Sequence, residues 1–371
     1  MAPATQRRLP VTVVTGFLGA GKTTLLRHLL LHSGRRLAVI VNEFGEVGID
    51  GALLRDCGFC PEEELEGRLV ELANGCLCCT VQDDFLPTMQ TLLAAADRLD
   101  GIVVETSGLA LPEPLVQAFA WPEIRSRTRV HGVVAVVDGE AVAQGSVVGD
   151  PASLERQRAA DPSLDHFDDL EELFDEQLEA ADLVLVSRAD RLDAGQWEVV
   201  RGRIERACRP GTQLLPIEQG RISPDLLLGL QRSEGPGGDG NPTDDHDHSH
   251  DHSHVPMQSV AVRLEGDFDR SRLEAVLREQ IERQAILRLK GWLQQPGKSR
   301  PLQIQAVGLR LDCWYEAQPE QVGGGARPAA AGLELVALGM RLDRAELEAA
   351  LGSTLAVQTG VAQTVAQSRG N

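Results

Sequence analysis

The sequence has no uninterrupted apolar run of about 18 residues or more, so we expect no membrane-spanning helix. Basic residues are also scarce, because 36 Lys and Arg face 55 Asp and Glu, and the net charge of −19 repels the phosphate backbone of nucleic acids. Only 13 aromatic residues (8 Phe, 4 Trp and 1 Tyr) are available to stack on bases. The composition therefore excludes a nucleic-acid partner and favours a soluble acidic enzyme or carrier.

Cysteine is scarce and unevenly placed. Five of the seven cysteines lie between Cys57 and Cys79, whereas Cys208 and Cys313 stand alone and are interpreted as structural. Crowded cysteines that are too few for a disulfide scaffold are typical of metal ligands or reactive thiols in a reducing compartment. Residues 1–20 resemble a signal peptide, but cleavage there would destroy the phosphate loop that follows, so we expect the protein in the cytoplasm.

Short β-branched runs alternate with helical periodicity over residues 1–233. These runs are apolar throughout, which is typical of strands buried on both faces of a parallel sheet. We therefore predict an α/β domain with a mostly parallel sheet covered by helices. The predicted strands are residues 11–15, 37–41, 101–104, 131–137 and 183–186.

Residues 234–255 interrupt this pattern. From residue 234 to residue 254 there are six acids, no Lys or Arg and no apolar side chain to bury, so we predict a disordered linker. Residues 256–355 predict a small α+β domain with helices on one face of an antiparallel sheet, and residues 356–371 a flexible tail. The predicted strands of the small α+β domain are 257–264, 285–293, 302–314 and 333–338, and its predicted helices are 269–281 and 343–351.

Residues 16–23 (GFLGAGKT) match the phosphate-loop pattern G-x-x-x-x-G-K-[ST] between a predicted strand and an apolar helix. The glycines let backbone N–H groups surround phosphate oxygens, Lys22 reaches the β and γ phosphates, and the Thr23 hydroxyl binds Mg²⁺. We therefore predict a P-loop NTPase. The residues expected to hold the nucleotide here are Gly16, Gly19, Ala20, Gly21, Lys22, Thr23 and Thr24.

A second part of the nucleotide site is expected at the tip of a neighbouring strand. Glu105 directly follows the predicted strand 101–104 and would orient the water shell of Mg²⁺. Glu105 and the phosphate-binding Lys22 are therefore catalytic candidates. Gly108 would let the backbone approach the γ-phosphate. Asp138 ends another strand and is a weaker candidate of the same type; a turn residue is an equally good interpretation.

Base selection is expected after strand 183–186. Ser187-Arg188-Ala189-Asp190 is similar to the Asn-Lys-x-Asp signature of GTPases, with Ser and Arg replacing Asn and Lys. Asp190 can accept from two guanine N–H groups that adenine lacks, and the Arg188 stem could lie along the base. A surface turn is the alternative. The sequence favours GTP.

The cysteine cluster predicts a metal site. Cys76, Cys78 and Cys79 lie within four residues, and thiolates at this spacing can converge on one soft or borderline divalent cation. Cys76 and Cys78 are the favoured ligands, with Cys79 a further candidate. Cys57 and Cys60 form a C-x-x-C pair that either binds metal or packs in a loop.

These motifs together resemble the CobW family of metal-handling P-loop GTPases. The resemblance rests on residues 16–24 (GFLGAGKTT), 42–50 (NEFGEVGID), 74–80 (NGCLCCT) and 105–110 (ETSGLA), followed by a His-rich linker and a small C-terminal domain. It implies a GTPase that binds a divalent metal and delivers it to an acceptor protein. Finer likenesses imply Co²⁺ as the cargo and the cobaltochelatase of cobalamin biosynthesis as the acceptor.

The resemblance also gives a role to two carboxylates in the segment where a P-loop GTPase would carry its first switch. It implies that Glu43 and Glu46 bind metal or sense the γ-phosphate, and we take Glu43 as a metal-ligand candidate and Glu46 as a catalytic candidate. A solvated loop is the alternative interpretation.

Five of the nine histidines alternate with Asp and Ser in the linker. Imidazoles on a flexible segment bind Zn²⁺, Co²⁺ or Ni²⁺ loosely, so we expect metal capture there; a merely solvated linker is the alternative. These histidines are His246, His248, His250, His252 and His254. Residues 164–178 carry many acids and no Lys or Arg, and their apolar spacing predicts an amphipathic helix with an acidic face.

The predicted mechanism is a metal site controlled by the nucleotide. Mg²⁺-GTP would hold the Glu43/Glu46 segment and the Glu105 strand end in the arrangement that positions Cys76 and Cys78, and hydrolysis would loosen it. Ligand chemistry cannot select cobalt, because thiolates and imidazoles bind Zn²⁺ at least as well as Co²⁺. The alternatives are a zinc chaperone serving zinc enzymes, a nucleotide-gated metal buffer without a delivery partner, and a P-loop kinase.

Overall fold

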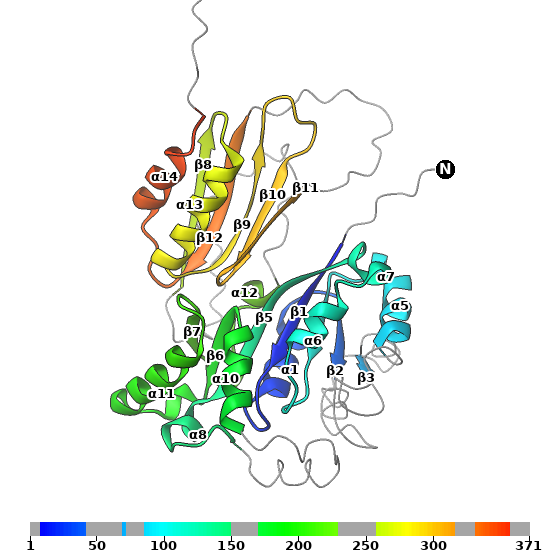
Figure 1. Cartoon of the computed structure of the whole chain (residues 1–371), viewed down its shortest axis with the longest axis vertical. Helices are drawn as coiled ribbons and strands as arrows, with labels where there is room; N and C mark the ends of the chain where they lie inside the picture. The colour runs from blue at the N-terminus through cyan, green and yellow to red at the C-terminus, as the bar shows by residue number, and fades with distance from the viewer. Residues whose placement is uncertain are drawn as a thin grey trace, which may run out of the picture.

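The computed structural model describes residues 8–41, 69–71, 85–149, 170–228, 257–315 and 331–356, which form two units with one sheet each (Figure 1). The predicted fold class, a parallel α/β sheet plus a small α+β C-terminal unit, is confirmed. The predicted linker and most of the predicted tail lie outside these residues. Within the described ranges, no helix is both long and apolar enough to cross a membrane.

The first unit is built on a seven-stranded sheet whose described strand pairs are all parallel. In spatial order its strands are β3 (Leu69–Glu71), β2 (Leu37–Val41), β4 (Gly101–Glu105), β1 (Leu9–Thr15), β5 (Thr128–Asp138), β6 (Leu183–Ser187) and β7 (Gln213–Pro216). The strands run past the predicted apolar runs because the ladder continues through polar residues such as Glu105 and Ser187. The sequence did not predict β3 and β7, which are only three and four residues long.

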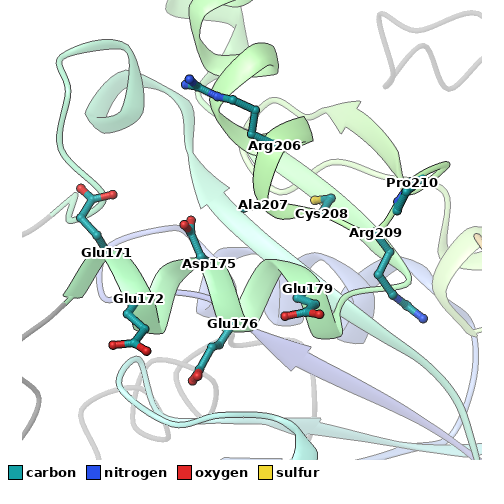
Figure 2. A pocket seen from close by; sticks show the side chains of 10 residues that line it. All are labelled: Glu171, Glu172, Asp175, Glu176, Glu179, Arg206, Ala207, Cys208, Arg209 and Pro210. Carbon is teal, nitrogen blue, oxygen red and sulfur yellow. The ribbon is translucent and has the colours of Figure 1, made fainter.

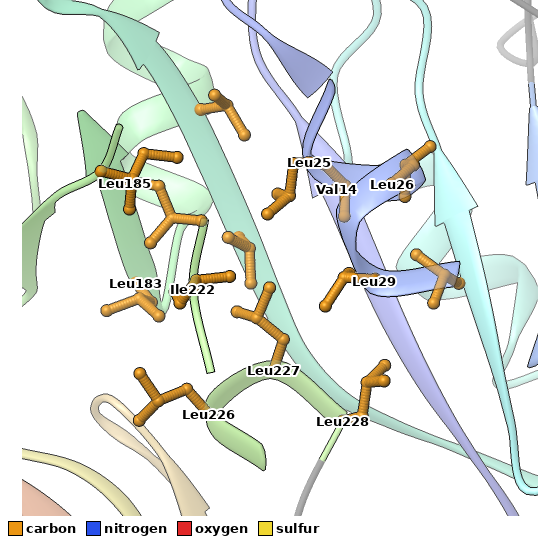
Figure 3. Packing of buried hydrophobic residues seen from close by; sticks show 14 of the residues in the cluster. Val14, Leu25, Leu26, Leu29, Leu183, Leu185, Ile222, Leu226, Leu227 and Leu228 are labelled. Atoms are coloured by element: carbon orange, nitrogen blue, oxygen red, sulfur yellow. The ribbon is translucent and has the colours of Figure 1, made fainter. Parts of the chain in front are cut away.

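Helices cover both faces of this sheet because successive strand residues point to opposite sides. Val14 of β1 packs with leucines of α1 and α12 (Figure 3), whereas Val13 packs on the other face with α5, α6 and α7. The amphipathic helix predicted over residues 164–178 is observed as α10, which packs with α11 over β5 and β6. The bounds are α1 (Lys22–His32), α5 (Leu86–Ala94), α6 (Glu113–Ala118), α7 (Pro122–Arg125), α8 (Gly139–Ala143), α10 (Leu170–Ala180), α11 (Ala194–Ala207) and α12 (Pro224–Leu228), with short 3₁₀ helices η2 (Ala96–Arg98) and η4 (Ala189–Arg191).

The C-terminal unit is a five-stranded antiparallel sheet with two helices on one face. Asp269 and Asp343 begin these helices, because each carboxylate accepts a backbone N–H three residues on. In spatial order the strands are β11 (Arg310–Tyr315), β10 (Leu302–Val307), β9 (Ile286–Gln294), β12 (Gly332–Gly339) and β8 (Gln258–Glu265), and the helices are α13 (Arg270–Arg283) and α14 (Arg344–Gly352).

The prediction of a single strand over residues 302–314 is wrong. The chain instead reverses at Gly308 and Leu309, so β10 and β11 form a hairpin with Val307 opposite Arg310. Gly308 has φ of 48°, and a Cβ there would lie 1.8 Å from the carbonyl oxygen of Asp182. The hairpin tip is therefore pressed against the first unit, where only glycine fits.

Asp182 joins the two units at that point. Its side chain is 1% exposed, and its Oδ2 accepts from Nε of Arg310 at 2.7 Å and from the Val133 N–H at 2.9 Å. Its Oδ1 accepts from Nη2 of Arg209 at 2.7 Å. Because Asp182 immediately precedes β6, the C-terminal sheet meets the large sheet at the edge where its strands begin (Figure 1).

We expect Asp182→Ala to lower the free energy of unfolding by about 3 kcal/mol, because it removes the carboxylate that pairs with Arg310 and Arg209 and leaves the buried Val133 N–H without its acceptor. Urea denaturation of the full chain measures this loss. The exposed Asp97→Ala serves as the control and should stay within about 0.5 kcal/mol of the unsubstituted protein. A loss below about 1 kcal/mol for Asp182→Ala would show that these contacts contribute little.

Candidate functional site

The phosphate loop has the backbone conformation that the motif predicts. Gly16 has φ of 134°, and a Cβ there would lie 2.1 Å from the carbonyl oxygen of Val136 on β5. Gly19 and Gly21 also have positive φ values, of 74° and 104°. The loop between β1 and α1 is therefore a compact turn packed against β5, with the N-terminus of α1 directed at its centre.

Lys22 and Glu105, the two predicted catalytic residues within the described ranges, lie together at this loop. The Lys22 ammonium donates to the carbonyl oxygens of Gly16 at 2.8 Å and Phe17 at 3.1 Å. Its Nζ lies 3.8 Å from Oε1 of Glu105, and both side chains are more than 90% buried. The strand order explains this proximity, because β4 is the direct neighbour of β1.

The segment after Glu105 closes against the phosphate loop. A Cβ on Gly108 would lie 2.8 Å from the backbone nitrogen of Leu18 and 2.7 Å from its Cγ, so glycine is required for this approach. Thr106 donates its hydroxyl hydrogen to Oγ1 of Thr15 at 2.9 Å, which ties the end of β1 to the segment. Residues 106–110 are therefore placed where the γ-phosphate of a bound nucleotide would be sensed.

Gln177 on α10 is a site residue that the sequence analysis missed. Its buried amide donates to the carbonyl oxygens of Gly108 at 3.2 Å and Ala110 at 3.0 Å. A polar residue on the buried face of an amphipathic helix, beside Phe174 and Leu178, was the available signal. Gln177 is thus a positioning residue for the Gly108 segment.

We expect Gln177→Leu to lower GTP turnover by up to about 30-fold, because the two carbonyl oxygens lose donors worth about 1 kcal/mol each. Affinity for GDP should stay unchanged, since GDP has no γ-phosphate for the segment to contact. Comparing turnover with GDP affinity separates this role from general destabilisation. Gln117→Leu, at an exposed position on α6, is the control, and equal turnover in the two variants would contradict the assignment.

The predicted base-recognition residues lie at the end of β6 on the same sheet edge. Arg188 has φ of 55°, and its Nη2 donates to the carbonyl oxygen of Gly19 at 3.2 Å. Its Nη1 pairs with the buried carboxylate of Asp138. Asp190 is exposed within η4. The structure therefore ties the Ser187–Asp190 turn to the phosphate loop, while contact with a guanine base stays a prediction.

Asp138 at the end of β5 acts as a helix cap. Its Oδ1 accepts from the backbone N–H groups of Glu140 at 3.1 Å and Ala141 at 3.2 Å, which begins α8. Its Oδ2 is the partner of Arg188. Both oxygens thus have partners within the protein, which agrees with the turn interpretation of Asp138.

The residues at this edge fit a Mg²⁺-nucleotide. Ser107 Oγ and Ser187 Oγ are buried without a hydrogen-bond partner in the described part of the chain, so both hydroxyls are available to a ligand. The Thr23 hydroxyl and the Glu105 carboxylate are hard oxygen donors of the kind that Mg²⁺ prefers. Lys22 and the loop N–H groups supply positive charge for the phosphates.

An acidic groove lies between α10 and α11 (Figure 2). It has a volume of about 690 Å³, with Arg206 and Arg209 across from the carboxylates. The carboxylates all come from α10: Glu171, Glu172, Asp175, Glu176 and Glu179. Cys208 also lines it, but burial raises the pKa of this thiol to about 12, so it stays protonated and is a poor metal ligand. Across the described ranges, no three His, Cys, Asp or Glu side chains converge to hold a metal ion.

The predicted transition-metal ligands and the remaining catalytic candidate lie outside the described residues, so their roles stay predictions. They are Glu43, Glu46, Cys57, Cys60, Cys76, Cys78, Cys79, His246, His248, His250, His252 and His254. The described strands nevertheless show where the chain enters two of these segments, the one with Glu43 and Glu46 and the one with Cys76, Cys78 and Cys79. Glu71 is in register with Val41, and Val41 with Glu105, so the chain leaves β2 and β3 at the nucleotide edge.

The glycine-lined loop, buried lysine and strand-end glutamate on a parallel sheet define a P-loop nucleotide-binding protein. Residues 10–215 match the family model described as CobW/HypB/UreG, nucleotide-binding domain, and residues 257–355 match the cobalamin synthesis protein cobW C-terminal domain. The chain belongs to the CobW/HypB/UreG family, which confirms the resemblance drawn from its motifs.

Three relatives match nearly the whole chain. It is 48% identical over 355 residues to the zinc chaperone CobW of Pseudomonas aeruginosa, covering 95% of this chain and 93% of that protein. It is 41% identical over 362 residues to the zinc chaperone CobW of Sinorhizobium sp, covering 94% and 98%. It is 30% identical over 353 residues to the zinc chaperone YjiA of Escherichia coli, covering 92% and 97%.

Proposed function

We propose that this protein is a GTP-hydrolysing metallochaperone that binds a divalent transition metal at Cys76 and Cys78 and delivers it to an acceptor protein. One structural observation carries the proposal. The chain segment containing the cysteines starts from β3 at the edge that also holds Lys22 and Glu105. Two strand spacings of about 4.8 Å separate Glu71 from Glu105, a distance of about 10 Å, and Cys76 follows Glu71 by only five residues.

The nucleotide chemistry follows from the residues of the loop. Lys22, which donates to two loop carbonyls in this structure, would turn its ammonium to the β and γ phosphates. The N–H groups of residues 16–23 would bind phosphate oxygens, and the Gly108 backbone would contact the γ-phosphate. Mg²⁺, held by Thr23 with Glu105 orienting its water shell, would neutralise phosphate charge. Asp190 would select guanine, with Ser187 and Arg188 holding its turn.

Metal control would come from the segments that follow β2 and β3. Val41 lies at the nucleotide edge, and Glu43 and Glu46 follow it in the sequence by two and five residues. A γ-phosphate that orders the Glu43/Glu46 segment would also affect the neighbouring cysteine segment, and its loss on hydrolysis would release the metal. The histidines of the linker would capture metal before transfer.

Zinc is the favoured cargo, because relatives that match nearly the whole chain, among them the three described above, are named zinc chaperones. Thiolates bind Zn²⁺ at least as tightly as Co²⁺, which agrees with this choice. Cobalt delivery to a cobaltochelatase is the second candidate, and it rests on the sequence motifs. Delivery to a partner in either case would take place in the cytoplasm.

GTP turnover in the presence of Zn²⁺, Co²⁺, Ni²⁺ or no added transition metal tests the proposal. We expect turnover to depend on the metal, and that dependence to disappear in Cys76→Ser/Cys78→Ser. Cys208→Ser is the matched control, because this thiol is largely buried and stays protonated. Transfer of the bound ion to an apo zinc enzyme or to a cobaltochelatase then separates the two cargoes. Metal-independent turnover without transfer would contradict the chaperone, and phosphate transfer to a small acceptor would identify a kinase.

A further inference from the structure

The turn that carries Asp190 leaves the end of β6 beside Asp138. Ser187, the last residue of β6, is in register with Asp138, the last residue of β5. The Ser187 hydroxyl has no hydrogen-bond partner in the described part of the chain, so this side chain does not fix the turn. Arg188 follows with φ of 55°, a left-handed conformation that is unfavourable for a residue with a side chain. The turn therefore depends on contacts made by Arg188 and the residues after it.

The guanidinium group of Arg188 connects the turn to two other parts of the first unit. Its Nη1 pairs with Oδ2 of Asp138, and its Nη2 donates to the carbonyl oxygen of Gly19 in the phosphate loop at 3.2 Å. Its Nε lies 3.8 Å from Oε2 of Glu140 on α8. Three separate nitrogens make these contacts, which a lysine with its single nitrogen could not reproduce. The arginine at this position is thus matched to the carboxylate of Asp138.

Asp138 is firmly placed and can therefore serve as an anchor. Its side chain is 2% exposed, and its Oδ1 accepts two backbone N–H groups at the start of α8. A Cβ on Gly149 would lie 2.2 Å from Oδ2 of Asp138, and a Cβ on Gly139 would lie 2.9 Å from the carbonyl oxygen of Ser187. Glycine at these two positions lets the backbone close over the carboxylate and lets α8 pack against the turn.

The ion pair between Asp138 and Arg188 is better shielded than the neighbouring pair. Arg191 pairs with Glu140 at 2.9 Å, but these side chains are 60% and 32% exposed, and a pair of this kind contributes little. The carboxylate of Asp138 is buried, and a buried pair depends on both of its charges. Removing the charge of Asp138 would therefore release the Arg188 side chain, which is 37% exposed, to solvent.

We propose that Asp138 is a positioning residue for base recognition, because it holds Arg188 and, through it, Asp190 in the place where guanine is selected. The inference rests on the proposed GTPase function, which assigns Asp190 to the base. Asp190 lies in η4, and the Arg191 N–H of this 3₁₀ helix donates to the Arg188 carbonyl oxygen at 3.1 Å. A displaced Arg188 therefore also displaces the carboxylate that accepts from the N1–H and the 2-amino group of guanine.

Affinities for GDP and for inosine diphosphate, which lacks the 2-amino group, test this role. We expect the unsubstituted full chain to bind GDP at least about tenfold more tightly, the value of one hydrogen bond to a charged acceptor. Asp138→Asn and Asp138→Ser each keep an oxygen that can cap α8 but lose the charge that holds Arg188. In both variants we expect the preference for GDP to fall by about threefold or more. Asp269→Asn, at the N-cap of α13, is the matched control and should keep the preference.

Arg188→Met shows whether Asp138 acts through Arg188. This variant keeps the apolar stem and removes the guanidinium group, so the preference for GDP should fall by the same factor. Adding Asp138→Asn to Arg188→Met should cause no further fall, because the two side chains act as one unit. A loss of preference that a merely structural defect would not produce is thereby assigned to this pair. Additive losses in the double variant overturn the inference.

The outcomes also separate this inference from the proposed function. If the unsubstituted protein binds neither nucleotide, the assignment of the phosphate loop and the proposed function both fail. If it prefers GDP and the preference survives in the Asp138 variants or in Arg188→Met, only the role of Asp138 fails. Equal affinity of the unsubstituted protein for GDP and inosine diphosphate overturns this role as well, because no selection of guanine then exists for Asp138 to support.

Discussion

Lys22→Ala is expected to lower GTP turnover by about 10²–10³-fold, the usual cost of removing one preorganised donor from a developing charge. The residue is 7% exposed and lies between the loop carbonyls and Glu105. No other described ammonium is near this loop, because Lys290 and Lys298 both belong to the C-terminal unit. The transferred phosphoryl group would therefore lose its main source of positive charge from the side chains.

The loss should appear in nucleotide binding as well as in turnover, because we expect Lys22 to contact the β-phosphate that GDP also carries. Phosphate release under saturating GTP measures turnover, and titration with labelled GDP measures binding. Lys298→Ala removes an exposed lysine and is the matched control. Turnover within threefold of the unsubstituted protein in Lys22→Ala would contradict the assignment of this loop as the nucleotide site.

The parallel sheet could be predicted because its central strands are buried on both faces and are therefore apolar throughout. The same reasoning failed for β3 and β7, which are too short to form such a run. It also failed at residues 302–314, where apolar residues continue up to both sides of the turn and Gly308 was the only signal. The strand prediction therefore failed where strands are very short and where a turn interrupts an apolar run.

The nucleotide site could be predicted where chemistry and spacing are local, as in residues 16–23 and at Glu105. Partners that are distant in the chain could not. Gln177 lies 69 residues from Gly108, and Asp182 lies 128 residues from Arg310. Pairing over such separations depends on how α10 and the C-terminal sheet pack, which no local pattern records.

The position of the C-terminal unit bears on how an acceptor protein would be recognised. This unit meets the large sheet where the strands begin, whereas the chain enters the Cys76–Cys79 segment from the opposite edge. In Figure 1 the C-terminal unit lies at the top and α8, which follows the end of β5, at the bottom. An acceptor that takes metal from Cys76 and Cys78 would therefore meet the first unit at its nucleotide edge.

The largest effect that we expect is a change in metal affinity of about 10⁴-fold between the GTP and GDP states. Moving a site from almost filled to almost empty requires about 5.5 kcal/mol of difference between two states, and a smaller shift would not release the metal. The register of Val41, Glu71 and Glu105 brings the start of both metal segments to the sheet edge that holds Lys22. We therefore expect a change at the γ-phosphate to affect the segment that begins after Glu71.

The decisive measurement is the Zn²⁺ and Co²⁺ dissociation constant of the protein, determined by chelator competition with a non-hydrolysable GTP analogue and again with GDP. Replacing all five linker histidines by serine removes their contribution to metal affinity. The further substitutions Cys76→Ser and Cys78→Ser show whether the remaining affinity belongs to the cysteine motif. We predict tight binding with the analogue and binding weaker by about 10⁴-fold with GDP. Equal dissociation constants in the two nucleotide states would contradict nucleotide control of the metal site.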